Sequence, residues 1–214
     1  MESPELARMR SEYARDGLDE ATAGDDPLSL FSRWLDDAVA AGLDEPNAMA
    51  LATATPDGRP SARIVLLKGF DARGLVFFTG YESRKGHELA ANPFAAATML
   101  WHPLQRQVRI EGPVTRVGEA ESDAYFTSRP RGAQIGAVAS PQSRTIPDRQ
   151  ALEERVAEVE HVFAERDVVR PPVWGGYRVA IESIEFWQGR QSRLHDRLRF
   201  TAAGDTWTRE RLAP

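Results

Sequence analysis

Residues 48–80 read AMALATATPDGRPSARIVLLKGFDARGLVFFTG. Three mainly apolar runs are separated by two short segments, PDGRP and DARG, that are rich in turn-forming residues. Apolar runs of this length, bounded by Gly, Pro and Asp, are typical of β-strands joined by tight turns. The stretch therefore predicts three consecutive antiparallel strands. Its nearly continuous apolar run from Ile64 to Leu67 predicts a second strand that is covered on both faces.

The sequence outside this stretch extends the same pattern. Further strands are expected within residues 94–101, 106–117, 177–187, 193–200 and 206–212. Helices are expected within 26–42, 83–92, 118–139 (broken at Arg129-Pro130) and 148–166. About seven or eight antiparallel strands with peripheral helices predict a mainly β protein, a small barrel. We expect one domain over 26–214, preceded by a flexible segment over 1–25.

Composition narrows the class of protein. The 214 residues include no Cys and only four scattered His, so neither a disulfide nor a metal centre is expected. The acidic start of the chain lacks the apolar segment of a signal peptide, and no apolar run reaches the roughly 18 residues of a membrane span. The net charge of −5 disfavours general nucleic-acid binding. We therefore expect a cytoplasmic protein with neither a nucleic acid nor a membrane as partner.

The charge is unevenly distributed. Residues 1–57 hold 13 acidic and 4 basic side chains, whereas 59–87 hold 6 basic and 2 acidic ones. Only two of the 27 basic residues are lysines, Lys68 and Lys85, and both lie in the basic segment. The ammonium group of a lysine is a compact point charge, unlike the fork of an arginine. This local excess of cations on an acidic chain suggests a small anionic ligand.

Two short segments are candidates for binding that anion. Ser83, Arg84 and Lys85 stand at the expected start of a helix, where free N–H groups favour a phosphate. Near the C-terminus, an extended Arg193–Phe200 would place Arg193, His195 and Arg197 on one face, beside the apolar ring of Trp187. The alternative interpretations are a solvated first helical turn and a solvated edge strand.

Several kinds of catalytic motif are absent. The sequence has no Walker loop, no GxGxxG after a strand and no nucleophile elbow around a serine. The cationic and hydrogen-bonding segments that remain can bind anions and heteroaromatic rings. The harder chemistry would then fall to a bound cofactor.

Seven further segments follow one another along the chain. They are RIVLLK (63–68), FFTG with the following RK (77–85), LQRQVRIEG (104–112), YFTSRPR (125–131), SPQS (140–143), VWGGYRV (173–179) and EFWQGRQSRLHDR (185–197). Taken together and in order, these segments resemble the pyridoxine (pyridoxamine) 5′-phosphate oxidases. The match runs from about Met9 to the final RLAP.

The resemblance implies an FMN-binding split β-barrel that forms a homodimer with FMN at the subunit interface. The residues that match family contacts to FMN are Arg63, Ile64, Val65, Leu66, Leu67, Lys68, Phe78, Thr79, Arg84, Lys85, Gln107, Gln142, Ser143, Trp187 and Arg197. Those that match contacts to the substrate phosphate are Lys68, Tyr125 and Arg129. Arg193 and His195, the implied catalytic pair, would face the pyridine ring, and Arg10 and Tyr13 match a segment that covers the substrate.

The activity implied by the resemblance is oxidation of pyridoxine 5′-phosphate or pyridoxamine 5′-phosphate to pyridoxal 5′-phosphate. Molecular oxygen would be the electron acceptor and would yield hydrogen peroxide. Three alternatives remain open. They are a related FMN oxidase of the phenazine-biosynthesis type, a non-catalytic pyridoxal phosphate binding protein, and a Schiff-base enzyme that uses Lys68.

One position departs from the family pattern. Ala133 stands where the family commonly carries a serine whose hydroxyl joins the substrate phosphate site. A hydrogen bond to a charged group contributes roughly 1.5–3 kcal/mol. We therefore expect weaker phosphate binding unless a neighbouring group or a water compensates.

Overall fold

A computed structural model describes residues 17–214. The chain divides into two compact units, and each is described by itself. The first contains residues up to 49, Ala97–Ile110 and Glu182–Pro214, and the second contains Ala50–Ala96 and Glu111–Ile181. Strands β1 (Ala48–Ala54), β5 (Phe94–Trp101) and β6 (Arg106–Arg116) contribute residues to both units.

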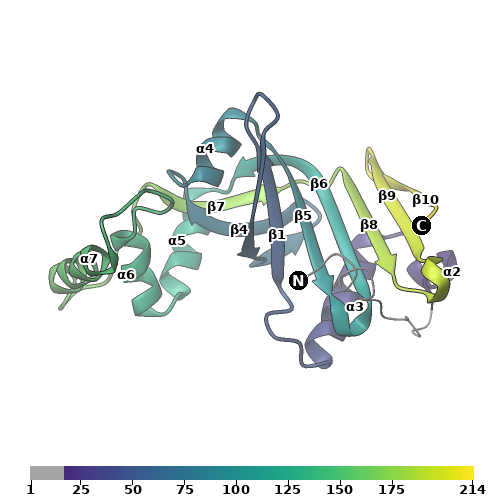
Figure 1. Ribbon diagram of the computed structural model, residues 1–214, viewed down its shortest axis with the longest axis horizontal. Helices are drawn as coiled ribbons and strands as arrows, with labels where there is room; N and C mark the ends of the chain where they lie inside the picture. Colours follow the sequence, from purple (N-terminus) through teal and green to yellow (C-terminus); the bar gives the residue numbers. More distant parts are fainter. Residues whose placement is uncertain (1–16) are drawn as a thin grey trace, which may run out of the picture. The chain divides into compact units, whose positions relative to one another are not determined.

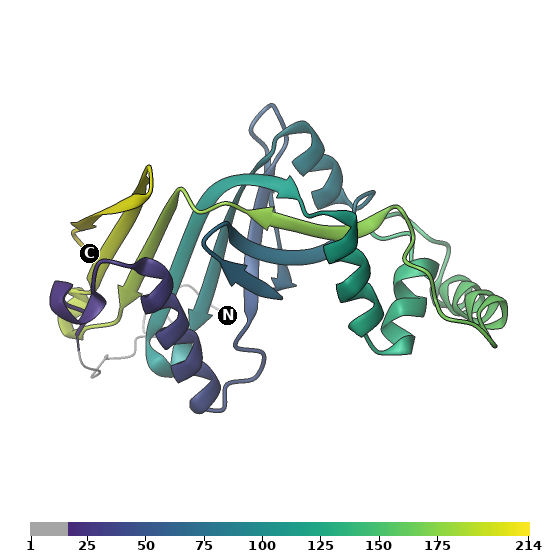
Figure 2. The same ribbon diagram turned by 180° about the vertical axis from the view of Figure 1, so that it is seen from behind.

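The first unit is a sheet with one long helix packed on it. Its strands are ordered β10 (Thr206–Arg211), β9 (Asp196–Ala203), β8 (Ser183–Gln188), β6 and β5. Helix α3 (Pro27–Ala40) lies against this sheet, as Figure 2 shows from behind. The rings of Trp34 and Phe186 pack edge to face, with their centroids 5.2 Å apart. This face is apolar because Phe186, Leu198 and Phe200 are fully buried beneath the helix.

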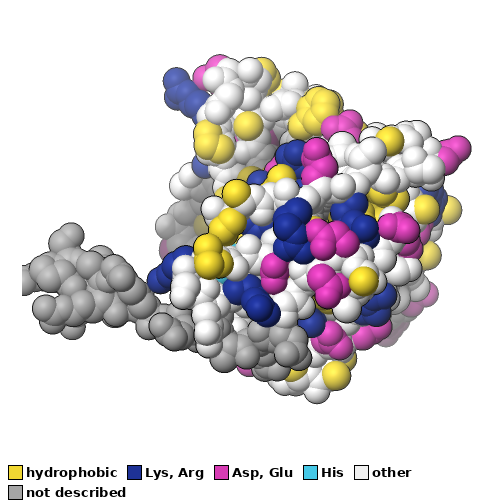
Figure 3. Space-filling model, turned by 90° about the vertical axis from the view of Figure 1, so that its right-hand side faces the viewer, with side chains coloured by type: hydrophobic (Ala, Val, Ile, Leu, Met, Phe, Trp, Pro, Cys, Tyr) yellow, Lys and Arg dark blue, Asp and Glu magenta, His cyan; other side chains and the backbone are white. Residues whose placement is uncertain are grey.

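The described part of the N-terminal segment is attached to the last strand. A short helix, α2 (Glu20–Ala23), is capped by the Asp19 side chain. Arg211 of β10 donates two hydrogen bonds to the Glu20 carboxylate, at 2.8 and 2.9 Å. Basic and acidic side chains alternate over this face of the molecule (Figure 3). A flexible segment was expected over residues 1–25. Residues 17–25 differ from this expectation, because the Arg211–Glu20 ion pair and the buried side chain of Leu18 hold them in place.

The second unit has two groups of paired strands. Strand β2 (Pro60–Leu66) pairs with β1, and β1 pairs with β5. Strand β4 (Gly74–Gly80) pairs with β3 (Gly69–Asp71) and, in antiparallel register, with β7 (Trp174–Val179), which also pairs with β6. Phe77 and Tyr177 face each other in the β4–β7 register, and their rings stack at 5.6 Å.

Four helices accompany these strands in the second unit: α4 (Arg84–Ala91), α5 (Glu119–Ser128), α6 (Arg131–Ala139) and α7 (Arg149–Val162). Helices α5, α6 and α7 lie together in Figure 1. Phe126, Ile135, Val168 and Trp174 form the buried cluster between them, and α7 adds Val156 and Val159. This small core holds Trp174 and the loop before α6 in place. No helix within residues 17–214 has the length and apolar character needed to cross a membrane.

The structure corrects several expectations. The described residues form ten strands and not the seven or eight expected, because 61–70 divides into β2 and β3 and 177–187 divides into β7 and β8. Helix α7 ends at Val162 and not at 166. Ile64 is 66% exposed in the single chain, although both faces of its strand were expected to be covered.

The extended conformation predicted for 193–200 is also wrong at its start. Residues Gln191–Arg193 form a 3₁₀ turn, and strand β9 begins only at Asp196. Ser192 and Arg193 have φ values of 56° and 63°, so the backbone here is left-handed. Arg193 therefore does not share a strand face with His195 and Arg197.

Candidate functional site

A buried lysine marks the start of helix α4. Ser83 caps the helix, and its hydroxyl accepts a hydrogen bond from the Gly86 N–H at 3.3 Å. The Lys85 ammonium donates to the hydroxyls of Thr79 (3.0 Å) and Ser83 (3.4 Å) and to the amide oxygen of Gln142 (3.5 Å). Gln142 is itself fixed, because its Oε1 also accepts from the Thr79 hydroxyl at 2.8 Å. The predicted helix start and three predicted cofactor residues thus come together here.

The charge of Lys85 is poorly compensated. Lys85 is 7% exposed, and within residues 17–214 its hydrogen-bond partners are neutral oxygens. Burial, followed by the positive charge of Arg63, lowers the pKa of Lys85, while Glu88 acts in the opposite sense. A buried ammonium without a carboxylate at contact distance favours the approach of an anion.

Arg63 and Arg84 belong to a second cluster centred on Glu88. Glu88 Oε2 lies 3.2 Å from Arg63 Nη2, and Oε1 accepts from Arg84 Nε at 2.9 Å. Arg63 also donates from Nη1 to the Leu51 carbonyl and to Thr53, and from Nη2 to Ser61. The cations predicted to bind phosphate are therefore partly engaged with the protein itself.

A pocket of about 440 Å³ in the second unit collects most of the residues predicted there. Its walls come from β2, β4, β7, α4, α5, the start of α6 and the loop after α6. The lining residues are Ile64, Val65, Leu66, Lys68, Phe78, Thr79, Lys85, Tyr125, Arg129, Pro130, Ala133, Gln142 and Trp174. This set contains eight of the predicted cofactor residues and all three of the predicted substrate-phosphate residues. Arg63, Leu67 and Arg84 are not among the residues that line it.

Arg129 supplies a further cation to this pocket, in addition to Lys68 and Lys85. Within the described chain, no hydrogen-bond partner reaches its buried Nη1 atom. Its guanidinium lies 4.6 Å from the centre of the Trp174 ring, and burial lowers its pKa. A guanidinium nevertheless stays charged at neutral pH, so a buried donor without a partner calls for an anionic acceptor. Beside it, Tyr125 stacks on Phe78 at 3.9 Å and forms an aromatic wall.

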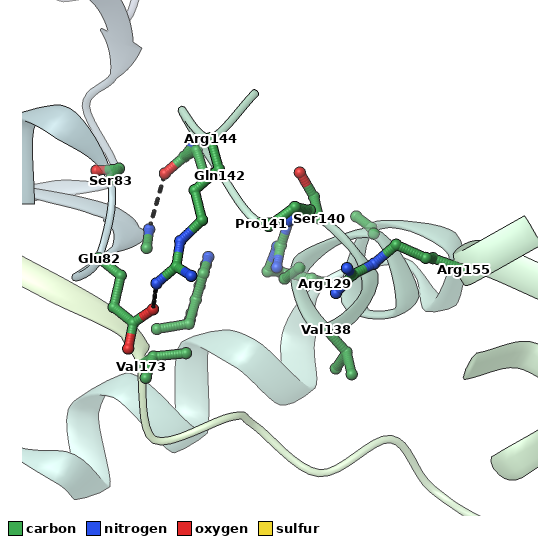
Figure 4. A pocket seen from close by; sticks show the side chains of 15 residues that line it. Glu82, Ser83, Arg129, Val138, Ser140, Pro141, Gln142, Arg144, Arg155 and Val173 are labelled. Atoms are coloured by element: carbon green, nitrogen blue, oxygen red, sulfur yellow. Dashed lines mark hydrogen bonds and ion pairs between the residues drawn. The ribbon is translucent and has the colours of Figure 1, made fainter. Parts of the chain in front are cut away.

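A second cavity, of about 520 Å³, shares Arg129, Ala133, Gln142 and Trp174 with the first pocket. Figure 4 shows the side chains that line it, with the Gln142 amide oxygen accepting a hydrogen bond from the N–H of Gly80 at the end of β4 and Arg144 paired with Glu82. The Arg144–Glu82 distance is 2.5 Å. Sequence reasoning missed Trp174, which lines both cavities, although VWGGYRV was among the segments that resemble the family.

Five further predicted site residues, Gln107, Trp187, Arg193, His195 and Arg197, lie in the first unit. Arg197 of β9 forms a bidentate ion pair with the buried Glu185, in which its Nε and Nη2 atoms donate to the two carboxylate oxygens at 2.8 and 3.1 Å. Trp187 and His195 lie with ring centroids 4.5 Å apart. Burial, followed by the charge of Arg193, lowers the pKa of His195, which favours the neutral imidazole. Gln107 lies on β6 and is partly buried.

Some of the predicted site residues are not grouped with the others in this structure. Arg193 is exposed on its left-handed turn, and Ser143 is exposed with φ 71°. Arg10 and Tyr13 lie outside the described residues. No group of three or more His, Asp or Glu side chains in the described residues is placed to bind a metal ion.

Comparison with known proteins decides the family. Residues 35–163 match the family described as pyridoxamine 5′-phosphate oxidase. This chain belongs to the pyridoxamine 5′-phosphate oxidase family. Residues 174–214 match the pyridoxine 5′-phosphate oxidase C-terminal dimerisation region, which supports the predicted homodimer. The resemblance identified from the seven segments is confirmed.

Curated members of the pyridoxamine 5′-phosphate oxidase family are similar over almost the whole chain. The pyridoxine/pyridoxamine 5′-phosphate oxidase of Rubrobacter xylanophilus is 59% identical and covers 98% of this chain and 97% of its own. That of Synechocystis sp. is 52% identical over the full length of both chains. The prediction of an enzyme, an oxidoreductase of this flavin-binding family, is therefore confirmed.

Solved structures confirm the fold class, a mainly antiparallel split barrel with peripheral helices. The crystal structure of PhzG from Burkholderia lata 383, in complex with tetrahydrophenazine-1-carboxylic acid, has a TM-score of 0.84 and 37% identity, covering 89% of this chain and 94% of that one. An FMN-binding protein related to pyridoxamine 5′-phosphate oxidase from Nostoc punctiforme has a TM-score of 0.69 over 86% and 97% of the two chains. At 17% identity the latter shows the fold alone.

Proposed function

We propose that this chain oxidises pyridoxine 5′-phosphate or pyridoxamine 5′-phosphate to pyridoxal 5′-phosphate. FMN would be the cofactor, and molecular oxygen, reduced to hydrogen peroxide, the electron acceptor. One observation carries the proposal: Lys85 and the buried, unpartnered Nη1 of Arg129 open onto the same pocket from different elements. FMN and the substrate each bring a phosphate ester of about two negative charges. Together with Lys68, which lines the same pocket, these cations suit two such groups.

The residues of this chain fit the phosphate end of FMN. Lys85 and the hydroxyls of Thr79 and Ser83 would bind the phosphate, and Gln142 would hold Lys85 and Thr79 in place. When bound, FMN supplies a ring that accepts a hydride, which none of the side chains here can do. The protein contributes binding, orientation and exclusion of water.

Arg129, Lys68 and Tyr125 are proposed to bind the substrate phosphate. Arg129 brings the desolvated cation, and Trp174 and Tyr125 bring flat apolar surface beside it. Arg193 and His195 are proposed, from the family resemblance, to orient the pyridine ring of the substrate. The Nδ1 atom of His195 accepts a hydrogen bond from the Arg190 N–H at 3.1 Å, so in the neutral imidazole Nε2–H is the donor and can orient the substrate without adding charge.

We further propose that FMN is held between two copies of this chain and that the enzyme works in the cytoplasm. The match of residues 174–214 to a dimerisation region supports the first of these proposals.

The decisive experiment is anaerobic addition of pyridoxine 5′-phosphate to the FMN-loaded protein. We expect the flavin absorbance to bleach and to return when oxygen is admitted, with release of hydrogen peroxide. The variant Arg193→Leu should retain FMN and bleach more slowly. A wild-type flavin that stays oxidised in the presence of both the alcohol and the amine substrate would refute the proposed function.

A second candidate function deserves the same assay. Ala133 lacks the hydroxyl expected for binding the substrate phosphate, and the PhzG structure at 37% identity holds a carboxylated phenazine. If tetrahydrophenazine-1-carboxylic acid were oxidised faster than either vitamer phosphate, the phenazine-type function would replace the one proposed above.

A further inference from the structure

Glu88 accepts four hydrogen bonds although its side chain is almost fully buried. It lies on helix α4 and is only 5% exposed. Its Oε2 accepts from the hydroxyls of Thr53 (2.5 Å) and Ser61 (2.6 Å) and from Arg63 Nη2 (3.2 Å), while Oε1 accepts from Arg84 Nε (2.9 Å). Three elements, β1, β2 and α4, therefore converge on one side chain.

Glu88 is charged despite its burial. Burial raises the pKa of Glu88, but the hydrogen bonds from Ser61, Thr53, Arg84 and Arg63 outweigh this effect and bring the pKa to about 2. At neutral pH a full negative charge therefore lies among three positive ones, on Arg63, Arg84 and Lys85.

The order of residues on α4 explains why this charge matters for the pocket. Glu88 lies four positions after Arg84 and three positions after Lys85, so it is a neighbour of both side chains on the helix surface. Lys85 opens onto the pocket, whereas Glu88 does not line it. Without Glu88, Arg63 would lose one of its four contacts, and Arg84, which is 64% exposed, would have no acceptor left among the described residues.

We propose that Glu88 is a positioning residue for the phosphate end of the cofactor site: it holds Arg63 and Arg84 beside Lys85 without itself contacting the ligand. The inference rests on the proposed binding of FMN. Its competitor is a purely structural role, in which Glu88 only joins β1 and β2 to α4.

FMN and riboflavin together distinguish these two roles, because riboflavin lacks the phosphate. The full-length dimeric protein, stripped of flavin, is titrated with each ligand while flavin fluorescence is followed. In Glu88→Gln we expect the dissociation constant for FMN to rise by roughly 10- to 100-fold, as is common when a supporting partner of a buried charge is removed. The dissociation constant for riboflavin should change by less than about twofold.

A conservative variant and a double substitution complete the test. Glu88→Asp keeps the charge and should recover part of the FMN affinity, and it serves in place of Glu88→Gln if that variant does not fold. In an Arg84→Gln background, Glu88→Gln should cost less FMN affinity than it does alone, because the two side chains act together. Equal losses of FMN and riboflavin affinity, or an unchanged affinity for FMN, would overturn the positioning role.

Failure of the proposed function gives a different result. If the wild-type protein bound FMN no better than riboflavin, the phosphate site itself would be absent. The proposal for Glu88 would then fall together with the proposed cofactor. A wild-type preference for FMN that survives unchanged in Glu88→Gln would refute only the role of Glu88.

Discussion

The buried charge of Glu88 leads to a prediction for stability as well as for binding. Its pKa is about 2 in the folded protein and 4.5 in an ordinary environment, so the folded state favours the carboxylate. Its contribution to stability is complete above pH 4.5 and is lost as the pH falls toward 2. Urea unfolding of the wild-type protein should therefore show a steeper loss of stability over this interval than unfolding of Glu88→Gln. At pH 7, Glu88→Gln should be less stable by about 3 kcal/mol.

Glu82→Gln is the matched control for this measurement. Glu82 also pairs with an arginine, Arg144, but both side chains are more than half exposed. An exposed pair contributes up to about 1 kcal/mol, so this variant should keep the wild-type pH dependence. Equal effects of the two substitutions would show that the burial of Glu88 has no consequence.

Ala133 provides a second prediction at the scale of one residue. It lines both cavities next to Arg129, and a serine there would bring a hydroxyl to the proposed phosphate position. We expect Ala133→Ser to lower the KM for pyridoxine 5′-phosphate roughly tenfold, because hydrogen bonds to charged groups are strong. FMN affinity should not change. Ala137 lines only the larger cavity, so the control variant Ala137→Ser should leave the KM unaltered. Equal KM values for the wild-type protein, Ala133→Ser and Ala137→Ser would contradict the proposed position of the phosphate.

Helix α4 depends on one glycine for its approach to the preceding loop. A Cβ atom at Gly86 would lie 2.1 Å from the carbonyl oxygen of Tyr81, which is backbone and cannot turn away. Gly86→Ala should therefore move the start of the helix, lower the thermal midpoint and weaken FMN binding together. In Gly132→Ala, on helix α6, the added Cβ meets nothing within 4 Å. This control should be neutral or more stable by about 0.5–1 kcal/mol, and a Gly86→Ala protein that behaves like it would contradict the close approach.

The elements themselves were predicted best where a local signal specified them. Asp26 and Ser83 begin their helices as expected, and the break at Arg129-Pro130 separates α5 from α6. Tertiary pairing was less visible in the sequence. Residues 61–70 read as one strand, but β2 pairs with β1 and β3 pairs with β4, so the chain must bend between them. Val39 follows the apolar pattern of α3 and was expected on its buried face. It is 59% exposed, because Leu30 and Ala38 lie on the face that is buried.

The candidate site was predicted more completely than the groups that support it. Lys85 and Thr79 are in contact, and Arg129 lines the same pocket. Glu88, Thr53 and Ser61 were missed, because one carboxylate among 32 acidic residues and two ordinary hydroxyls carry no distinguishing pattern. Their importance comes only from the convergence of β1, β2 and α4. The left-handed turn at Ser192 and Arg193 was missed for a related reason, since neither residue is a glycine and nothing local announces it.

At the scale of the whole molecule, the exposed Leu194 points to the assembly. It is 70% exposed in the single chain, lies between Arg193 and His195, and falls within the region that matches the family's dimerisation segment. An aliphatic side chain left in water beside proposed site residues suggests a surface that a second copy covers. Leu194→Asp should then shift sedimentation from dimer to monomer and weaken FMN binding, because a buried charge would have no partner.

Val169 is equally exposed, at 70%, but lies outside both family matches. Val169→Asp should therefore sediment as a dimer and keep its FMN, and two variants that dissociate alike would remove the reason for placing Leu194 at the interface.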